Sequence, residues 1–214
     1  MNVAKPKEEP GRQSRQQRGY ARTRSKLLTA ARSVFTEKGL SASVDEIAER
    51  ADVARGSFYY HFKTKERLIN LMVEDVLSEL TNRMNKEGAD KKGLEAVLDG
   101  IIQAHIGFFS NRWQDFVLYY QGRADLTLEE SYDGLKKPFL KYARSIEELI
   151  EAGTSEPIQD ARLRRIASAI AGFMAGYYSF AIIASTDQDI DKEFISLRGA
   201  FVTSLARFAK EALP

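Results

Sequence analysis

Residues 43–65 have the sequence SVDEIAERADVARGSFYYHFKTK, and this stretch decides the fold of the N-terminal part of the chain. Ser43 and Glu46 have the spacing of a capping box, so a helix is expected to begin there. Apolar residues then recur at intervals of three and four and form one stripe: Val44, Ile47, Ala48 and Ala51. The stripe is broken at Asp52 and Val53, which predicts a tight turn after the first helix.

A second short helix is expected from about Arg55 to His61. Its apolar residues Val53, Phe58 and Phe62 can face the first helix. The opposite face carries hydrogen-bonding side chains: Arg55, Ser57, Tyr60 and His61, with Tyr59 beside them. Two short helices joined in this way form a helix-turn-helix, whose second helix reads the major groove of DNA. The pattern therefore indicates a recognition helix.

The same residues also resemble a known family. The run G-x-F-Y-Y-H-F-x-x-K-E-x-L, from Gly56 to Leu68, closely resembles the TetR family of bacterial transcriptional regulators, as does V-D-E-I-A-E-R-A before it. The resemblance covers roughly residues 20 to 70, and the rest of the chain is similar only in length and helical pattern. It implies an all-α homodimer that binds a DNA operator and responds to a small-molecule effector.

The resemblance implies phosphate contacts from Tyr59, His61 and Lys65, and a DNA-backbone contact from the capping hydroxyl of Ser43. The chemistry of the remaining side chains indicates base reading, because Arg55 can pair bidentately with guanine and short hydroxyls can bond either kind of base. Gly56 is expected to let the helix approach closely. The residues expected at the DNA are Ser43, Ala54, Arg55, Ser57, Tyr59, Tyr60, His61 and Lys65. Alternatively, the ring of Tyr59 packs on its own domain and leaves only its hydroxyl free.

The charge of the chain is unevenly distributed. Residues 1–67 hold 15 Lys and Arg against 8 Asp and Glu, whereas residues 68–214 hold 17 against 22. The basic part coincides with the helix-turn-helix, which favours a nucleic-acid partner over a merely solvated face. We expect a disordered basic arm at 1–19, a DNA-binding domain at 20–66, and a ligand-binding and dimerisation domain at 67–214. The first helix is expected from about Ala21 to Lys38, ended by Gly39.

The C-terminal part shows only helical periodicity, so the fold class is all-α. A helix to about Met84 links the two domains. The segment 113–120, WQDFVLYY, is rich in aromatic residues, and QGRADLTLEES after it is expected to be a loop. An apolar effector pocket is expected here. Its predicted lining residues are Phe108, Trp113, Phe116, Tyr120, Arg123 and Phe173, with His105 as another candidate polar anchor. Aromatic residues at helical spacing are also consistent with plain core.

The last two helices, about 159–184 and 189–212, are expected to form the dimer interface. The first of them is apolar around much of its circumference, and its small residues permit close approach of another helix. The predicted interface residues are Ala169, Gly172, Gly176, Phe180, Phe201 and Leu205.

Other functions are disfavoured by what the sequence lacks. It contains no cysteine, two histidines, no Gly-rich phosphate loop and no hydrolase motif, so neither an enzyme nor a cofactor or metal site is expected. No apolar run approaches the roughly 20 residues of a membrane span, and a cytoplasmic location is expected. The function expected is a repressor released from a palindromic operator by a small apolar or amphipathic ligand. The alternative is an architectural or co-regulator DNA-binding protein whose C-terminal half only dimerises.

Overall fold

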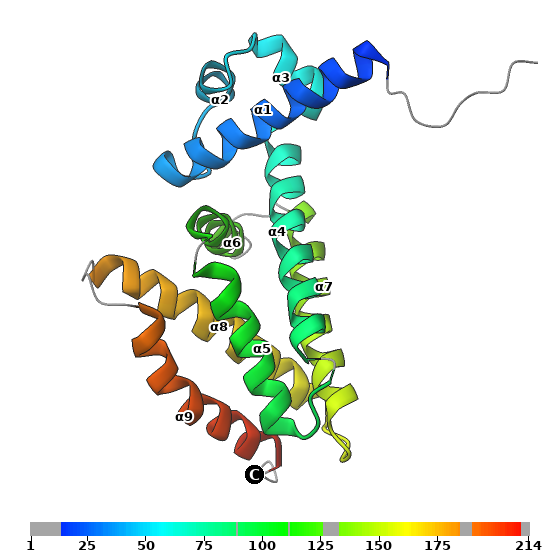
Figure 1. The fold of residues 1–214 in the computed structure, drawn as a ribbon, viewed down its shortest axis with the longest axis vertical. Helices are drawn as coiled ribbons and strands as arrows, with labels where there is room; N and C mark the ends of the chain where they lie inside the picture. The colour runs from blue at the N-terminus through cyan, green and yellow to red at the C-terminus, as the bar shows by residue number, and fades with distance from the viewer. Residues whose placement is uncertain (1–13, 89, 111, 126–132, 185–189, 211–214) are drawn as a thin grey trace, which may run out of the picture. The chain divides into compact units, whose positions relative to one another are not determined.

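The computed structural model describes residues 14–88, 90–110, 112–125, 133–184 and 190–210, and every regular element within these ranges is an α-helix (Figure 1). The predicted all-α class is confirmed. The chain divides into two compact units, residues 1–65 and 66–214. Within the described ranges, no helix is both long and apolar enough to cross a membrane.

The first unit consists of α1 (Arg15–Lys38), α2 (Val44–Arg50) and α3 (Arg55–Phe62). α1 begins earlier than expected, because Ser14 and Gln17 form a capping box: the Gln17 N–H donates to Ser14 Oγ, and the Ser14 N–H to Gln17 Oε1. The prediction of a disordered arm through residue 19 is therefore wrong for residues 14–19. Residues 1–13 lie outside the described ranges.

The core of the first unit combines the apolar faces of all three helices. Its fully or almost fully buried side chains are Leu27, Ala31, Val34, Phe35, Ile47, Ala48, Phe58 and Phe62. The predicted capping box at Ser43 and Glu46 is confirmed and starts α2. Gly39 ends α1 with φ 78°, and Asp52 turns the chain between α2 and α3 with φ 53°. Aspartate tolerates this left-handed conformation better than most residues, which permits the tight turn.

The second unit contains the remaining helices. They are α4 (Lys65–Gly88), α5 (Leu94–Phe109), α6 (Trp113–Asp125), α7 (Asp133–Gly153), α8 (Asp160–Ala184) and α9 (Ile190–Lys210). α4 extends four residues past the expected Met84. α6 continues through residues 121–125, so the loop expected after Tyr120 is wrong for those residues. α5 packs on α7 and α9, and α8 packs on α7 and α9.

The core of the second unit includes a buried polar pair. His105 on α5 is fully buried; its Nδ1 is 2.7 Å from the Ile101 carbonyl oxygen, and its Nε2 is 2.5 Å from the Tyr142 hydroxyl on α7. An Nδ1–H that donates to the carbonyl leaves Nε2 to accept from the tyrosine, so both ring nitrogens are satisfied in the neutral form. Burial lowers the pKa of His105 to about 4. His105 is thus a hydrogen-bonded core residue rather than an anchor exposed to a ligand.

We predict that this histidine makes stability depend on pH. The pKa of His105 is about 4 in the folded chain and near 6.5 when unfolded, so the unfolded chain takes up the proton first. The contribution of neutral His105 to the free energy of unfolding is therefore lost as the pH falls below 6.5. Between pH 7 and pH 5 the free energy of unfolding should fall by about 2 kcal/mol, measured by urea denaturation. His105→Gln should flatten this dependence, whereas His61→Gln, a change at a half-buried histidine, should leave most of it. An equal slope in wild type and His105→Gln contradicts the assignment.

Candidate functional site

The outward face of α3 is the most distinctive surface of the first unit. Phe58 and Phe62 are fully buried, while Tyr59 is 38% and Tyr60 64% exposed. A Cβ added at Gly56 would meet nothing within 4 Å, so packing within the unit does not require glycine there. Glycine at this helical position costs up to about 1 kcal/mol relative to alanine. The open space beside Gly56 indicates that glycine serves the close approach of an external molecule to α3.

Arg55, at the start of α3, is held by its neighbours. Its Nη1 lies 3.0 Å from Asp45 Oδ2 on α2, and its Nη2 donates to the Tyr59 hydroxyl at 3.3 Å. The guanidinium also lies over the Tyr59 ring, 5.7 Å from its centroid. Both members of the ion pair are mostly exposed, so the pair is weak and can be exchanged for an external anion.

Tyr20 of α1 joins the aromatic residues of α3. Its ring centroid lies 4.3 Å from that of His61 and 5.8 Å from that of Tyr60. The His61 Nδ1 is buried and has no hydrogen-bond partner, and burial together with the charge of Arg24 lowers the pKa of His61. The neutral His61 ring therefore packs against Tyr20 of α1. Sequence reasoning missed Tyr20, because it falls at the boundary of the segment expected to be disordered.

Two residues predicted to contact DNA are engaged within the unit. The Ser43 hydroxyl donates to Glu46 Oε2 at 3.0 Å while it accepts from the Glu46 N–H. The Lys65 ammonium donates to the carbonyl oxygens of Leu40 and Ala42 at 3.0 and 3.2 Å. An ammonium has three donors, so Lys65 retains one beyond these two bonds. Lys65 fixes the connection between α1 and α2, whatever else it contacts.

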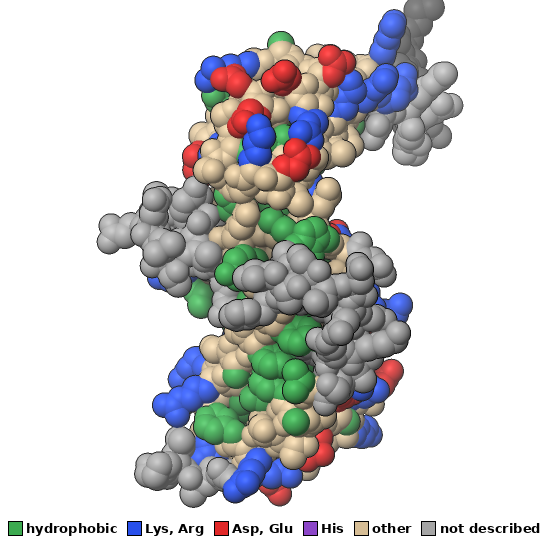
Figure 2. Space-filling model, turned by 90° about the vertical axis from the view of Figure 1, so that its left-hand side faces the viewer, with side chains coloured by type: hydrophobic (Ala, Val, Ile, Leu, Met, Phe, Trp, Pro, Cys, Tyr) green, Lys and Arg blue, Asp and Glu red, His purple; other side chains and the backbone are tan. Residues whose placement is uncertain are grey.

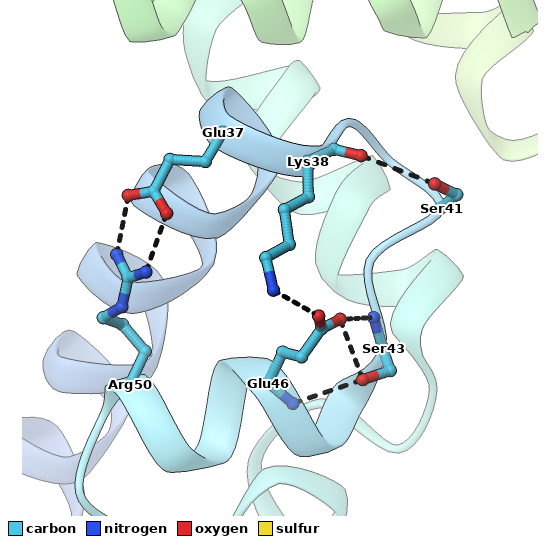
Figure 3. Close-up of polar contacts among 6 residues, drawn as sticks. All are labelled: Glu37, Lys38, Ser41, Ser43, Glu46 and Arg50. Atoms are coloured by element: carbon cyan, nitrogen blue, oxygen red, sulfur yellow. Dashed lines mark hydrogen bonds and ion pairs between the residues drawn. The ribbon is translucent and has the colours of Figure 1, made fainter.

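A polar network joins α1 to α2 (Figure 3). Arg50 on α2 forms two 2.7 Å bonds to the two carboxylate oxygens of Glu37 on α1, and Lys38 bonds Glu46 at 2.6 Å. These hydrogen bonds lower the pKa of both Glu37 and Glu46 to about 2. The forked Arg50 geometry restricts the orientation of α2, and hence of the turn that leads to α3.

The predicted effector-pocket residues lie mainly in an aromatic cluster of the second unit. Phe116 stacks with Trp113 and Tyr120 at centroid distances of 5.3 and 6.0 Å. Phe108, buried on α5, contacts Phe109 at 5.0 Å, and the Phe109 ring lies 5.5 Å from that of Phe116. Phe173 instead stacks on Phe201 of α9 at 4.1 Å. Arg123 lies on α6, but its side chain is outside the description. The structure thus brings four of the six residues together, as packed rings.

A cleft lies elsewhere, between α4 and α7. Its volume is about 570 Å³, and none of the six predicted residues lines it. Polar side chains of α4 and α7 border it, among them Thr81, Asn82 and Ser145, and the ring of Tyr142 contributes to its wall. The volume is within the range of small-molecule sites.

The residues predicted at a dimer interface differ in exposure. Ala169, Gly172, Gly176 and Phe201 are half-buried, and a Cβ on Gly176 would meet nothing within 4 Å. Leu205 is only 7% exposed, because it packs within its own unit, and its place at a dimer interface stays a prediction. The side chain of Phe180 lies outside the description. Leu197, half exposed on α9, was not among the predicted residues.

Comparison with known proteins identifies this architecture. Residues 27–72 match the family described as "Bacterial regulatory proteins, tetR family". The chain is 36% identical over 95 residues to the Transposon Tn10 TetC protein of Escherichia coli, and 31% identical over 100 residues to the HTH-type transcriptional repressor KstR2 of Mycolicibacterium smegmatis. These alignments cover 41% and 46% of this chain and about half of each relative, 48% and 49%.

A solved structure extends the similarity to most of the fold. The transcriptional regulator FadR from Bacillus subtilis, determined in complex with stearoyl-CoA, has a TM-score of 0.65 with this chain, covers 85% of it and 97% of its own length, and is 20% identical. At that identity the likeness concerns the fold. The helices and the α2–α3 turn form a helix-turn-helix, and the segment 27–72, which contains it, matches the TetR family.

The double engagement of Lys65 predicts a structural contribution. Lys65→Met should lower the free energy of unfolding by about 1–3 kcal/mol, since two carbonyls lose a charged donor. Lys63→Met, a change at an exposed lysine two residues away, should have little effect. Urea denaturation measures the loss, and faster hydrogen exchange in α2 localises it. Equal stability of the two variants contradicts this role.

Proposed function

We propose that this chain is a DNA-binding transcriptional repressor, released from a palindromic operator by a small apolar or amphipathic ligand. The observation that supports it best is the outward face of α3. Burial of Phe58 and Phe62 directs Arg55, Tyr59 and Tyr60 away from the core, at the helix that enters the major groove in a helix-turn-helix. The family's description and the repressor KstR2 among the relatives agree with this function.

The contacts divide into two kinds on this proposal. Arg55 and Ser57 lie in the first turn of α3, where side chains reach base edges, and Tyr60 extends the same surface. Tyr59 and His61, with the remaining donor of Lys65, are assigned to phosphates. Ser43 is assigned to the DNA backbone, and its hydroxyl must then exchange its bond to Glu46. Ala54, which caps α3 without a side-chain hydrogen bond, leaves its first N–H groups open to a phosphate.

An effector is proposed to bind the second unit. FadR, with the same fold, is described in complex with stearoyl-CoA, and the α4–α7 cleft offers a site of suitable volume in this chain. Arg112 contacts several elements around the aromatic cluster: it forms ion pairs with Glu79 of α4 and Asp115 of α6, and lies over Phe108 of α5. A ligand in the cleft contacts α4 directly, and one that displaces α6 acts on α4 through Arg112; either would shift the population between two states.

Dimerisation is proposed to use α8 and α9. Gly176 and Gly199 face open space, and Leu197 is half exposed. Figure 2 shows hydrophobic side chains gathered on one face of the second unit. A two-fold dimer reads two half-sites about one helical turn, ~34–36 Å, apart, which a palindromic operator supplies.

The experiment that tests DNA binding is selection of bound sequences from random DNA. Ser57→Ala and Tyr60→Ala should each change the preferred sequence, because they remove contacts to bases. Tyr59→Phe should instead weaken binding to all sequences by a similar factor, since a phosphate contact carries no sequence information. The same selected operator, challenged with apolar and amphipathic compounds, tests release by an effector.

Two outcomes count against these assignments. Uniform losses across sequences for all three variants show that base and phosphate roles are misassigned. Failure of the wild-type protein to enrich any sequence contradicts the repressor function itself.

The dimer assignment predicts that Gly176→Arg yields folded monomers with operator affinity at least tenfold lower, because a bulky charge is placed where helices must approach closely. Analytical ultracentrifugation measures the mass. Ala96→Arg, an equivalent change at an exposed position of α5, is the control and should remain dimeric. A dimeric Gly176→Arg variant with normal affinity places the interface elsewhere.

A further inference from the structure

The beginning of α5 and the end of α9 lie at the same end of the second unit (Figure 1). A second cleft is lined by residues of both helices there. It has a volume of about 520 Å³ and is lined by residues 93–94, the α7–α8 connection 154–159, Arg162 and residues 209–210. None of these residues lines the α4–α7 cleft. Polar and apolar groups are both present in its wall.

Arg162 is the unusual residue of this cleft. It is only 8% exposed, yet within the described part of the chain it forms no ion pair with a carboxylate. Its Nη1 donates to the Ala209 carbonyl oxygen at 3.0 Å, near the end of α9, and its buried Nε has no hydrogen-bond partner among the described residues. A buried charge is costly unless its donors are satisfied. The bond to Ala209 uses Nη1, so the Nε–Nη2 edge of the guanidinium remains. This is an edge with which arginine can bind a carboxylate through two parallel hydrogen bonds.

The surroundings of Arg162 also favour an anion. α5 is 16 residues long and begins after Gly93 without a side-chain cap, so the N–H groups of its first turn are open at the edge of the cleft. Lys210 lines the cleft from α9, and among the lining residues that the structure describes Glu156 is the one carboxylate. Two cations against one carboxylate leave a net charge of +1, which matches a ligand with a single negative charge. The side chains of Leu94, Pro157 and Ile158 add apolar wall beside these groups.

We propose that this cleft binds a small organic monocarboxylate, with its carboxylate on Arg162 and Lys210 and its short apolar chain against Leu94, Pro157 and Ile158. Since the Nε of Arg162 is closed to water, seating the carboxylate requires a small shift of this side chain or of the 154–159 connection. The site is separate from both the α3 surface and the α4–α7 cleft, so it does not depend on the function proposed for either.

The test uses the full-length protein and defined probes: acetate, hexanoate and inorganic phosphate, at constant ionic strength against chloride. Amide NMR signals of Leu94 and Glu95 and the Arg162 Nε–H signal report binding. Hexanoate should shift all three signals and bind several-fold more tightly than acetate, because it buries additional methylene groups. Arg162→Gln should weaken hexanoate binding at least tenfold and Lys210→Gln several-fold. Arg164→Gln, a change at an exposed arginine of the same helix, should leave it unchanged.

Equal shifts in wild type and in both cleft variants overturn the site, because they indicate a general ionic effect. Shifts caused by phosphate but not by hexanoate overturn the monocarboxylate assignment. Arg162→Gln loses its bond to Ala209 and could fail to fold, in which case two other measurements test the proposal. An unchanged hexanoate affinity in Lys210→Gln refutes it. An Arg162 Nε–H signal that hexanoate does not shift in the wild-type protein also refutes it.

Discussion

The burial of Phe58 and Phe62 is the constraint on which the first unit depends. Both rings are fully buried and stand four positions apart in the sequence, so they lie on one face of α3 and fix its rotation about its own axis. With that rotation fixed, Tyr59 and Tyr60 must point outward. The position of the exposed surface is therefore a consequence of hydrophobic packing on the opposite side of α3. The hydrogen bonds of Arg50 and Lys65 further restrict the orientation of α2 and the α1–α2 connection.

Much of this architecture was predictable from the sequence, because apolar periodicity and capping residues are local signals. The capping box at Ser43 and the glycine that ends α1 both follow from such signals. The early start of α1 was missed, since residues 14–20 are exposed and exhibit no apolar stripe. The capping box of Ser14 and Gln17 is nevertheless present in the sequence and could have revealed it.

The site was less predictable than the fold. Residue type indicates what a side chain can bind, but not which partner within the folded chain it contacts. Lys65 was assigned to a phosphate, whereas two backbone carbonyls far away in sequence already hold it. Phe108 and Phe116 were assigned to a pocket, and periodicity placed them inside correctly. Whether rings inside a helical unit enclose space or fill it depends on the packing of several helices, which a single sequence does not specify.

The ion pair between Asp45 and Arg55 has a consequence for how such a protein changes over time. On the proposed interface, a guanidinium must leave Asp45 before it reaches a guanine, so each operator competes with a carboxylate inside the protein. Substitution of Asp45 then alters how strongly each operator that presents this guanine is held, while the side chains that distinguish sequences remain the same. Affinity and recognition are thus adjustable by separate residues, and a duplicated copy of the gene can be weakened or strengthened at its existing targets before it acquires new ones.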